Sequence, residues 1–341
     1  MKELREIWVD DVKILACILV TLGHFFQSMV AAGILAETAM YQWFNETIYY
    51  FHVPLFFLCS GYLYQKNNGI GTRWSWQKNV IQKGITLGVP YIVFSLATWL
   101  LKEVFSGSVN SQNAGLMRTL LLEPASPYWY LYTLFFIFLT IPRFASGKTA
   151  VLFAGWVLSL KSLRVLGLVD TGVYAINTVM DNAIWFVSGM LMRFLPKEKW
   201  YQRPGMLTAG MILTAVFMAV SLRIAAVDIR CSFLSLIMGL LGCISVVFIM
   251  KSWAPGKGMR RIANLMAVYT MPIFLMHTIF AAGLRAVFLK MGIFNAAVHV
   301  VFGITVSFVG PIMAFIIMER LSLDFLIYPG KYIPQLRNKG I

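Results

Sequence analysis

Apolar residues run along the chain in long segments that short polar stretches separate. Because about 20 apolar residues cross a bilayer as a helix, each segment is long enough to be a membrane span. The pattern predicts an all-α polytopic membrane protein with about ten transmembrane helices. The connecting loops are short, so we expect a single integral membrane domain over residues 1–341. The predicted spans are 12–34, 47–65, 84–102, 127–146, 149–167, 174–195, 205–226, 231–250, 264–289 and 297–319.

The first span differs from the others because polar side chains recur on it at helical spacing. The stripe consists of Asp10, Lys13, Cys17, Thr21, His24 and Ser28. Lys13 and His24 are eleven residues apart, which is about three helical turns and roughly 16 Å on the same face. An ionisable side chain inside a membrane is costly and marks a functional site by default. The stripe therefore predicts a functional face on this helix.

Composition agrees with the membrane prediction, since 59% of the 341 residues are hydrophobic and 13% are charged. The formal net charge is +15, but the basic residues recur between apolar segments, which argues against nucleic-acid binding. Roughly 21 of the 29 Lys and Arg residues fall in the N-terminal segment and every second loop, which predicts cytoplasmic N- and C-termini. Lys2 and Arg5 also resemble the start of a signal peptide, but the long run that follows favours a retained span.

Histidines are the candidates for catalysis and acceptor binding. His24 could act as a general base toward a hydroxyl, and the alternative is a histidine that only packs against another helix. His52 could orient an acceptor or could belong to an interfacial aromatic belt with Tyr49 and Tyr50. His277 lies well inside its predicted span and is a second polar candidate, whereas His299 is expected at a helix mouth.

Basic residues near the predicted cytoplasmic ends are candidates for holding the phosphates of an anionic cosubstrate. The set comprises Lys13, Lys78, Lys83 and Arg73. Topogenic charge explains the same residues without any ligand. The four cysteines have no metal-ligand spacing, and neither a P-loop nor an HExxH zinc helix occurs, so we expect no metal and no bound cofactor.

Several separated motifs resemble the acyltransferase-3 family, and within it the fucose 4-O-acetylase-like branch. The first is Lys13, ten residues, then His24, where the family more often has arginine before the histidine. The second is the stretch Phe51-His52-Val53-Pro54-Leu55-Phe56-Phe57 with Ser60-Gly61-Tyr62. The others are Lys78 to Tyr91, where the Arg-x-x-Arg pattern of the family is absent, the aromatic run Tyr128-Trp129-Tyr130-Leu131, and Tyr269 to His277.

The resemblance implies transfer of an acyl group, usually acetyl, from acyl-CoA to a hydroxyl of a cell-envelope glycan or a lipid-linked precursor. The bilayer would be that of a bacterial plasma membrane. His24 would take the catalytic role of the family and Lys13 its cationic role. Ser60, Tyr62 and Trp129 are candidates for stabilising the oxyanion, and Trp129 could also stack on a sugar ring. Monomer and homodimer are not distinguished.

Two other hypotheses about the function remain open at this point. A transporter of a polar or anionic solute would use the His24 stripe to line its pathway. A non-catalytic partner in envelope synthesis would tolerate the loss of His24. Turnover of acyl-CoA separates both from an acyltransferase.

Overall fold

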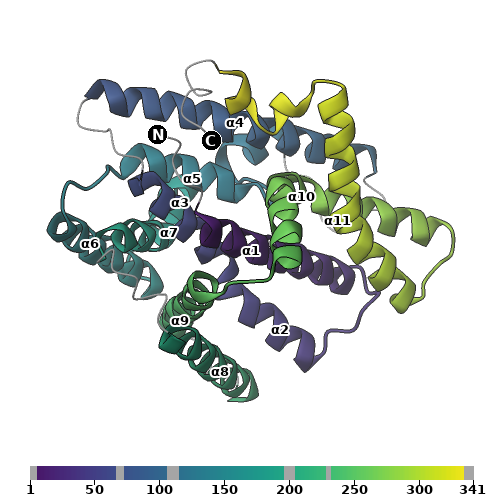
Figure 1. Cartoon of the computed structure of the whole chain (residues 1–341). Helices are drawn as coiled ribbons and strands as arrows, with labels where there is room; N and C mark the ends of the chain where they lie inside the picture. The colour runs from purple at the N-terminus through teal and green to yellow at the C-terminus, as the bar shows by residue number, and fades with distance from the viewer. Residues whose placement is uncertain (1–5, 67–72, 106–114, 196–203, 228–231, 334–341) are drawn as a thin grey trace.

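The computed structural model describes residues 6–66, 73–105, 115–195, 204–227 and 232–333, and within them the chain is helical without a β-strand (Figure 1). Eleven α-helices occur in these ranges. Their bounds are α1 Ile7–Ala31, α2 Ala39–Tyr49, α3 His52–Lys66, α4 Arg73–Val104, α5 Trp129–Thr140, α6 Gly147–Val165, α7 Tyr174–Leu191, α8 Pro204–Val227, α9 Ser232–Ser252, α10 Lys257–Lys290 and α11 Ala296–Arg320.

Each predicted span overlaps a helix, but the second divides and the fourth is shorter than expected. A span over 127–146 was predicted, whereas α5 ends at Thr140 because Pro142 disfavours helical backbone at Ile141. A single helix was expected over 47–65, whereas α2 ends at Tyr49 and α3 begins at His52. Pro54 has no N–H to donate to the carbonyl of Tyr50, so a continuous helix would lose a hydrogen bond there. Proline is tolerated in the first turn of a new helix, which is where Pro54 lies in α3.

Six helices in the described part of the chain are long and apolar enough to cross a membrane, which supports a multi-pass membrane protein. They are Ile7–Ala31, Trp76–Val104, Gly205–Val227, Ser232–Ser252, Lys257–Lys290 and Ala296–Arg320. A further short apolar helix is Trp129–Thr140. The total of ten crossings and the orientation of the termini stay predictions.

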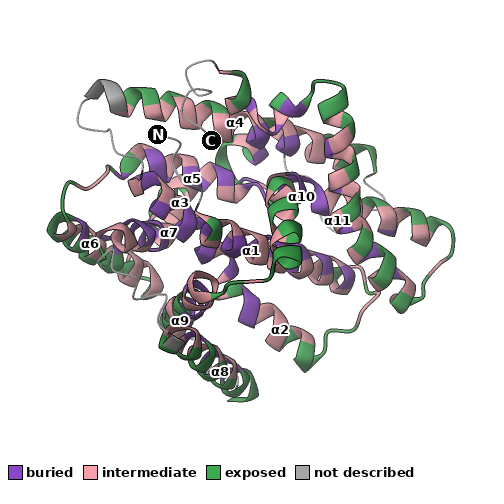
Figure 2. Cartoon of the chain, viewed as in Figure 1, coloured by how far each residue is buried: buried purple, intermediate pink, exposed green. Residues whose placement is uncertain are grey.

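Helix α1 runs through the middle of the bundle and contacts α3, α9, α10 and α11 (Figure 1). Buried residues gather on α1, α3 and α7, whereas α6 and α8 are largely exposed (Figure 2). A span that is apolar on its outer side is what a lipid environment requires. The main core cluster joins α1 to α3, α9 and α10 through residues such as Val12, Leu55 and Leu275.

Contacts between helix termini define two ends of the bundle. At the first, called the Glu6 end, Lys66 Nζ lies 3.1 Å from Glu6 Oε1 and Arg260 Nη1 lies 2.8 Å from Asp11 Oδ1. At the opposite end, called the Ser28 end, Arg285 of α10 hydrogen-bonds Ser28 near the end of α1. Helices α1 and α10 are therefore parallel, and α3 runs in the opposite direction to both.

Candidate functional site

Three histidines from three helices converge in the half of the bundle nearer the Ser28 end, and we call them the histidine cluster: His24, His52 and His277. The ring centroids of His24 and His277 are 5.4 Å apart. His24 also lies close enough to His52 and to His277 for electrostatic interaction. His24 is half-buried, whereas His52 and His277 are each 1% exposed. His24 is the member of the cluster that a ligand can reach most easily.

Backbone carbonyls set the orientation of two of these rings. His277 Nδ1 lies 2.9 Å from the carbonyl oxygens of both Ile273 and Phe274. His52 Nδ1 lies 2.5 Å from the carbonyl oxygen of Ile48. A carbonyl only accepts, so in the neutral ring Nδ1 carries the proton and Nε2 carries the lone pair. The His277 Nε2 is buried and has no hydrogen-bond partner in the described part of the chain.

Ser126 brings a hydroxyl to the ring of His24, with Oγ 3.4 Å from Nε2. Ser126 is exposed and lies just before α5, so the hydroxyl beside His24 belongs to a residue at the surface of the chain. No acidic side chain among the described residues hydrogen-bonds to His24. Ser126 was absent from the sequence predictions, because a serine in a polar loop has no distinctive spacing.

The predicted cations divide into two groups. Lys13 of α1 and Lys83 of α4 lie close enough for electrostatic interaction, and Arg143, just after α5, joins them. Lys83 Nζ also lies over the Phe138 ring, 4.6 Å from its centroid. Neither lysine forms an ion pair with an acidic side chain of the described residues. Lys13, Lys83 and Arg143 form the cation cluster, an assembly of like charges typical of an anion site.

The other predicted cations lie outside this cluster. Lys78 is exposed on α4, and the side chain of Arg73 lies outside the described part of the structure. Two further basic residues at the Glu6 end, Lys66 and Arg260, are in ion pairs with Glu6 and Asp11. Arg143 was not among the sequence candidates, and only its position beside Lys83 suggests a role.

The predicted acceptor and oxyanion residues lie between the two clusters or at the Glu6 end. Ser60 Oγ is 3.1 Å from the hydroxyl oxygen of Tyr130, which also donates to the carbonyl of Phe56 at 3.3 Å. Tyr62 donates to Glu6 Oε1 at 3.2 Å, so it lies at the Glu6 end. Trp129 packs on Phe57, with ring centroids 6.4 Å apart. The structure does not bring these three residues into contact with His24.

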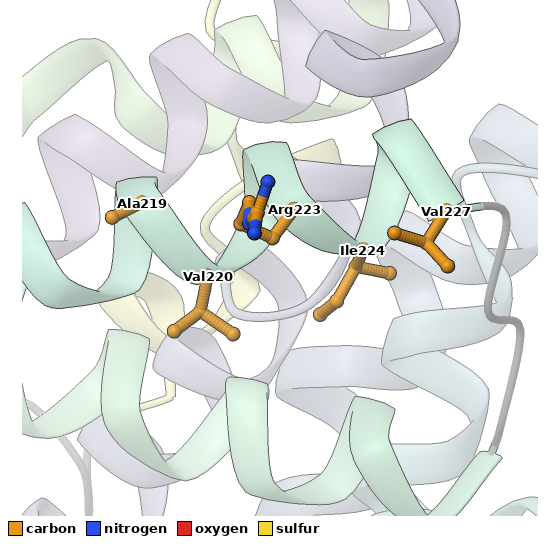
Figure 3. Close-up of a pocket in the computed structure, with 5 residues that line it drawn as sticks. All are labelled: Ala219, Val220, Arg223, Ile224 and Val227. Atoms are coloured by element: carbon orange, nitrogen blue, oxygen red, sulfur yellow. The ribbon is translucent and has the colours of Figure 1, made fainter.

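A hollow on α8 lies apart from this chemistry. Its lining consists of Ala219, Val220, Arg223, Ile224 and Val227 (Figure 3). Apart from Arg223, these side chains are apolar and offer no group that abstracts a proton. We therefore place the candidate site at the histidine cluster.

Within the described ranges, no group of three or more histidine, cysteine, aspartate or glutamate side chains is arranged to hold a metal ion. The described cysteines, Cys17, Cys59 and Cys243, are buried free thiols. Cys59 Sγ lies 4.0 Å from the carbonyl oxygen of Val9. Their positions fit small buried hydrophobes.

Comparisons with known proteins identify the family of the chain. A family model described as "Acyltransferase domain", for the acyltransferase-3 family, matches residues 6–316. The chain is 26% identical over 161 residues to nodulation protein NolL of Mesorhizobium japonicum, covering 47% of this chain and 41% of that protein. It is 28% identical over 161 residues to nodulation protein NolL of Sinorhizobium fredii, covering 47% and 42%.

The chain thus spans about two fifths of the length of the curated relatives that it matches. No solved structure matches the chain. The family match includes every helix that contributes to the histidine and cation clusters. The resemblance expected from the sequence motifs is confirmed, and the chain belongs to the acyltransferase-3 family.

Proposed function

We propose that the chain is a membrane O-acyltransferase that moves an acyl group, most simply acetyl, from acyl-CoA to a hydroxyl of a cell-envelope or exopolysaccharide sugar. The observation that carries this proposal is the histidine cluster in a chain of an acyltransferase family. His24 is half-buried beside an exposed serine, so an acceptor hydroxyl can take the place of the Ser126 hydroxyl at Nε2.

The cation cluster is the proposed site for the donor phosphates. Lysine binds phosphate as a point charge, and arginine adds a planar fork of donors. Along α1, Lys13 and His24 are separated by about three turns, roughly 16 Å. A donor held by its phosphates at Lys13, Lys83 and Arg143 would therefore need an extended arm to bring its thioester to His24, which is the shape of CoA.

The proposed reaction is one acyl transfer. His24 accepts the proton of the acceptor hydroxyl as its oxygen attacks the thioester carbonyl carbon. The C–S bond then breaks, and the CoA thiolate takes the proton from His24, which returns to its starting state. His277 Nε2, with its lone pair directed by the two carbonyl bonds, is a second acceptor available to orient the attacking hydroxyl.

The aromatic residues between the two clusters would help to exclude water from the thioester. Tyr130 packs on Phe56 and Phe274, with ring centroids 5.6 and 5.7 Å away. A water-poor interior limits hydrolysis of a reactive donor. We place the protein in the bacterial plasma membrane with the Glu6 end toward the cytoplasm, where acyl-CoA is available.

The experiment that tests the proposal is release of free CoA from acetyl-CoA by the purified protein in nanodiscs. Wild type and His24→Ala are compared with and without crude envelope glycans. We expect glycan-dependent release by wild type that the variant lacks. No release by either protein would contradict acyl-CoA chemistry and favour a transporter, and equal release by both would contradict the role of His24.

A further inference from the structure

Arg285 is a buried guanidinium near the Ser28 end that the reaction described above does not use. It lies on α10, and its residue is 5% exposed. No acidic side chain of the described residues forms an ion pair with it. Burying a charge in a membrane protein without a counter-ion is costly, so the presence of the Arg285 guanidinium at this position requires an explanation.

Helix packing explains one edge of the guanidinium and leaves the other available. Nη1 donates to the carbonyl oxygen of Ser28 at 3.1 Å and also contacts the Ser28 hydroxyl. Among the described residues these are the hydrogen bonds of Arg285, and its Nε is buried without a hydrogen-bond partner there. The remaining edge, formed by Nε and Nη2, is the fork with which arginine binds a phosphate or carboxylate through two hydrogen bonds.

The position of the guanidinium relates it to the histidine cluster. Ser28 follows His24 by four residues on α1, so the two share a face about one turn, roughly 6 Å, apart. Arg285 follows His277 on α10, and side chains on a helix tilt toward its N-terminus, here toward the histidines. The guanidinium is therefore about one turn from His24, on the side opposite to the cation cluster.

We propose that Arg285 is a binding site for an oxyanion, a phosphate or carboxylate, carried by the acceptor about one helical turn from the hydroxyl that reacts. The assignment of this anion to the acceptor rests on the proposed function, whereas binding of the anion does not. The acceptor is then an acidic sugar or a sugar phosphate, and Arg285 selects it over a neutral sugar. Two separate cationic sites, one at each side of His24, would hold donor and acceptor.

The experiment is thermal unfolding of the full chain in phosphatidylcholine nanodiscs, followed by tryptophan fluorescence. The probes are glucose 1-phosphate, methyl glucuronide, glucose and CoA. A ligand that binds only the folded state raises Tm in proportion to its affinity. We expect at least one of the two acidic sugars, but not glucose, to raise the Tm of wild type and of Lys83→Gln, and not that of Arg285→Gln.

CoA provides the matched control, because its binding should depend on the cation cluster and not on Arg285. We expect CoA to raise the Tm of Arg285→Gln as it does for wild type, and to raise that of Lys83→Gln less. An acidic-sugar shift that survives in Arg285→Gln, or the absence of any such shift in wild type, would overturn the proposal. If Arg285→Gln does not fold, Arg285→Lys replaces it, and a wild-type shift in that variant would contradict bidentate binding.

Nanodiscs with phosphatidylglycerol distinguish a lipid headgroup from a soluble ligand. An Arg285-dependent rise in Tm on adding this lipid, with no further effect of the sugars, would assign the oxyanion to a headgroup phosphate. Sugar shifts that persist in this lipid would assign it to the acceptor as proposed, whereas the headgroup result would keep the anion site and overturn its assignment to the acceptor. The CoA-release assay is independent, since its failure would refute acyl transfer and leave the Tm result standing.

Discussion

The neutral His277 ring is held in one tautomer, because its Nδ1 faces two backbone carbonyls one turn earlier in α10. A histidine at this depth could have bonded across to another helix through both nitrogens and served packing alone. Its Nε2 instead lies buried near His24, with no hydrogen-bond partner in the ranges that the structure describes. This arrangement suits a group that receives a hydrogen bond from a substrate hydroxyl.

His24→Gln tests the proton acceptor at the residue scale. Glutamine keeps a polar side chain of similar size, but its amide does not accept a proton, so transfer should fall by at least about 100-fold. Expression should remain near that of wild type. The measurement is CoA release per mole of folded protein.

His299→Gln is the matched control for this substitution. His299 is 2% exposed, but its Nε2 lies 2.8 Å from the carbonyl oxygen of Ile293, outside the histidine cluster. It should therefore retain most of the activity. Comparable losses in both variants would point to damage to the fold and contradict the role assigned to His24.

The cation cluster makes a prediction about the donor. Lys83→Gln removes one charged contact to phosphate, worth about 1.5 kcal/mol, so KM for acetyl-CoA should rise roughly tenfold with little change in kcat. Lys13→Ala should raise KM for acetyl-CoA more than Lys13→Arg does. Lys148→Gln, an exposed position at the start of α6, should have no effect. Steady-state kinetics at saturating acceptor measure both constants, and a fall in kcat alone would place the donor elsewhere.

At the scale of elements, two glycines permit the closest helix contact that determines how α3 and α7 pack. A Cβ on Gly61 would lie 1.9 Å from the carbonyl oxygen of Phe186, and one on Gly189 would lie 1.9 Å from that of Leu58. Small residues at such a crossing let two backbones approach within a membrane. The crossing positions α3, which begins with His52 and carries Ser60.

Gly189→Ala should therefore separate α3 from α7. The added methyl group meets backbone, which cannot rotate away, and overpacking of this kind costs about 1–3 kcal/mol or more. We expect a clear fall in Tm in detergent together with lower CoA release. Gly155→Ala in α6 is the control, because a Cβ there has no neighbour within 4 Å. An unchanged Tm for Gly189→Ala would mean that the crossing is wider than the structure shows.

For the whole molecule, the alternation of helix ends gives a testable topology. We expect the loops at the Glu6 end to be cytoplasmic and those at the Ser28 end to lie outside. Single cysteines at the exposed positions Lys148 and Ala254 should resist an impermeant maleimide in intact cells, whereas Glu37 and Thr171 should react. The background carries Cys231→Ser, since the other cysteines are buried. Labelling of the two pairs in the reverse pattern would invert the proposed orientation.

Much of the fold follows from local pattern. Apolar runs of membrane length predicted helices at each segment, because in lipid the backbone must satisfy its own hydrogen bonds. The division between α2 and α3 was missed, since Pro54 lies only three residues from the break and the apolar run continues through it. Proline within α10, by contrast, leaves that helix unbroken at Pro272.

The sequence by itself determined the helical class, the position of most helices and the candidacy of His24, His52 and His277, because an ionisable residue in an apolar run stands out locally. Only the tertiary structure decided which residues share a site. It separated Lys83 from Lys78 and added Ser126, Arg143 and Arg285. These groups come from segments far apart in the chain, and their proximity depends on packing between helices, which the spacing within one helix does not encode.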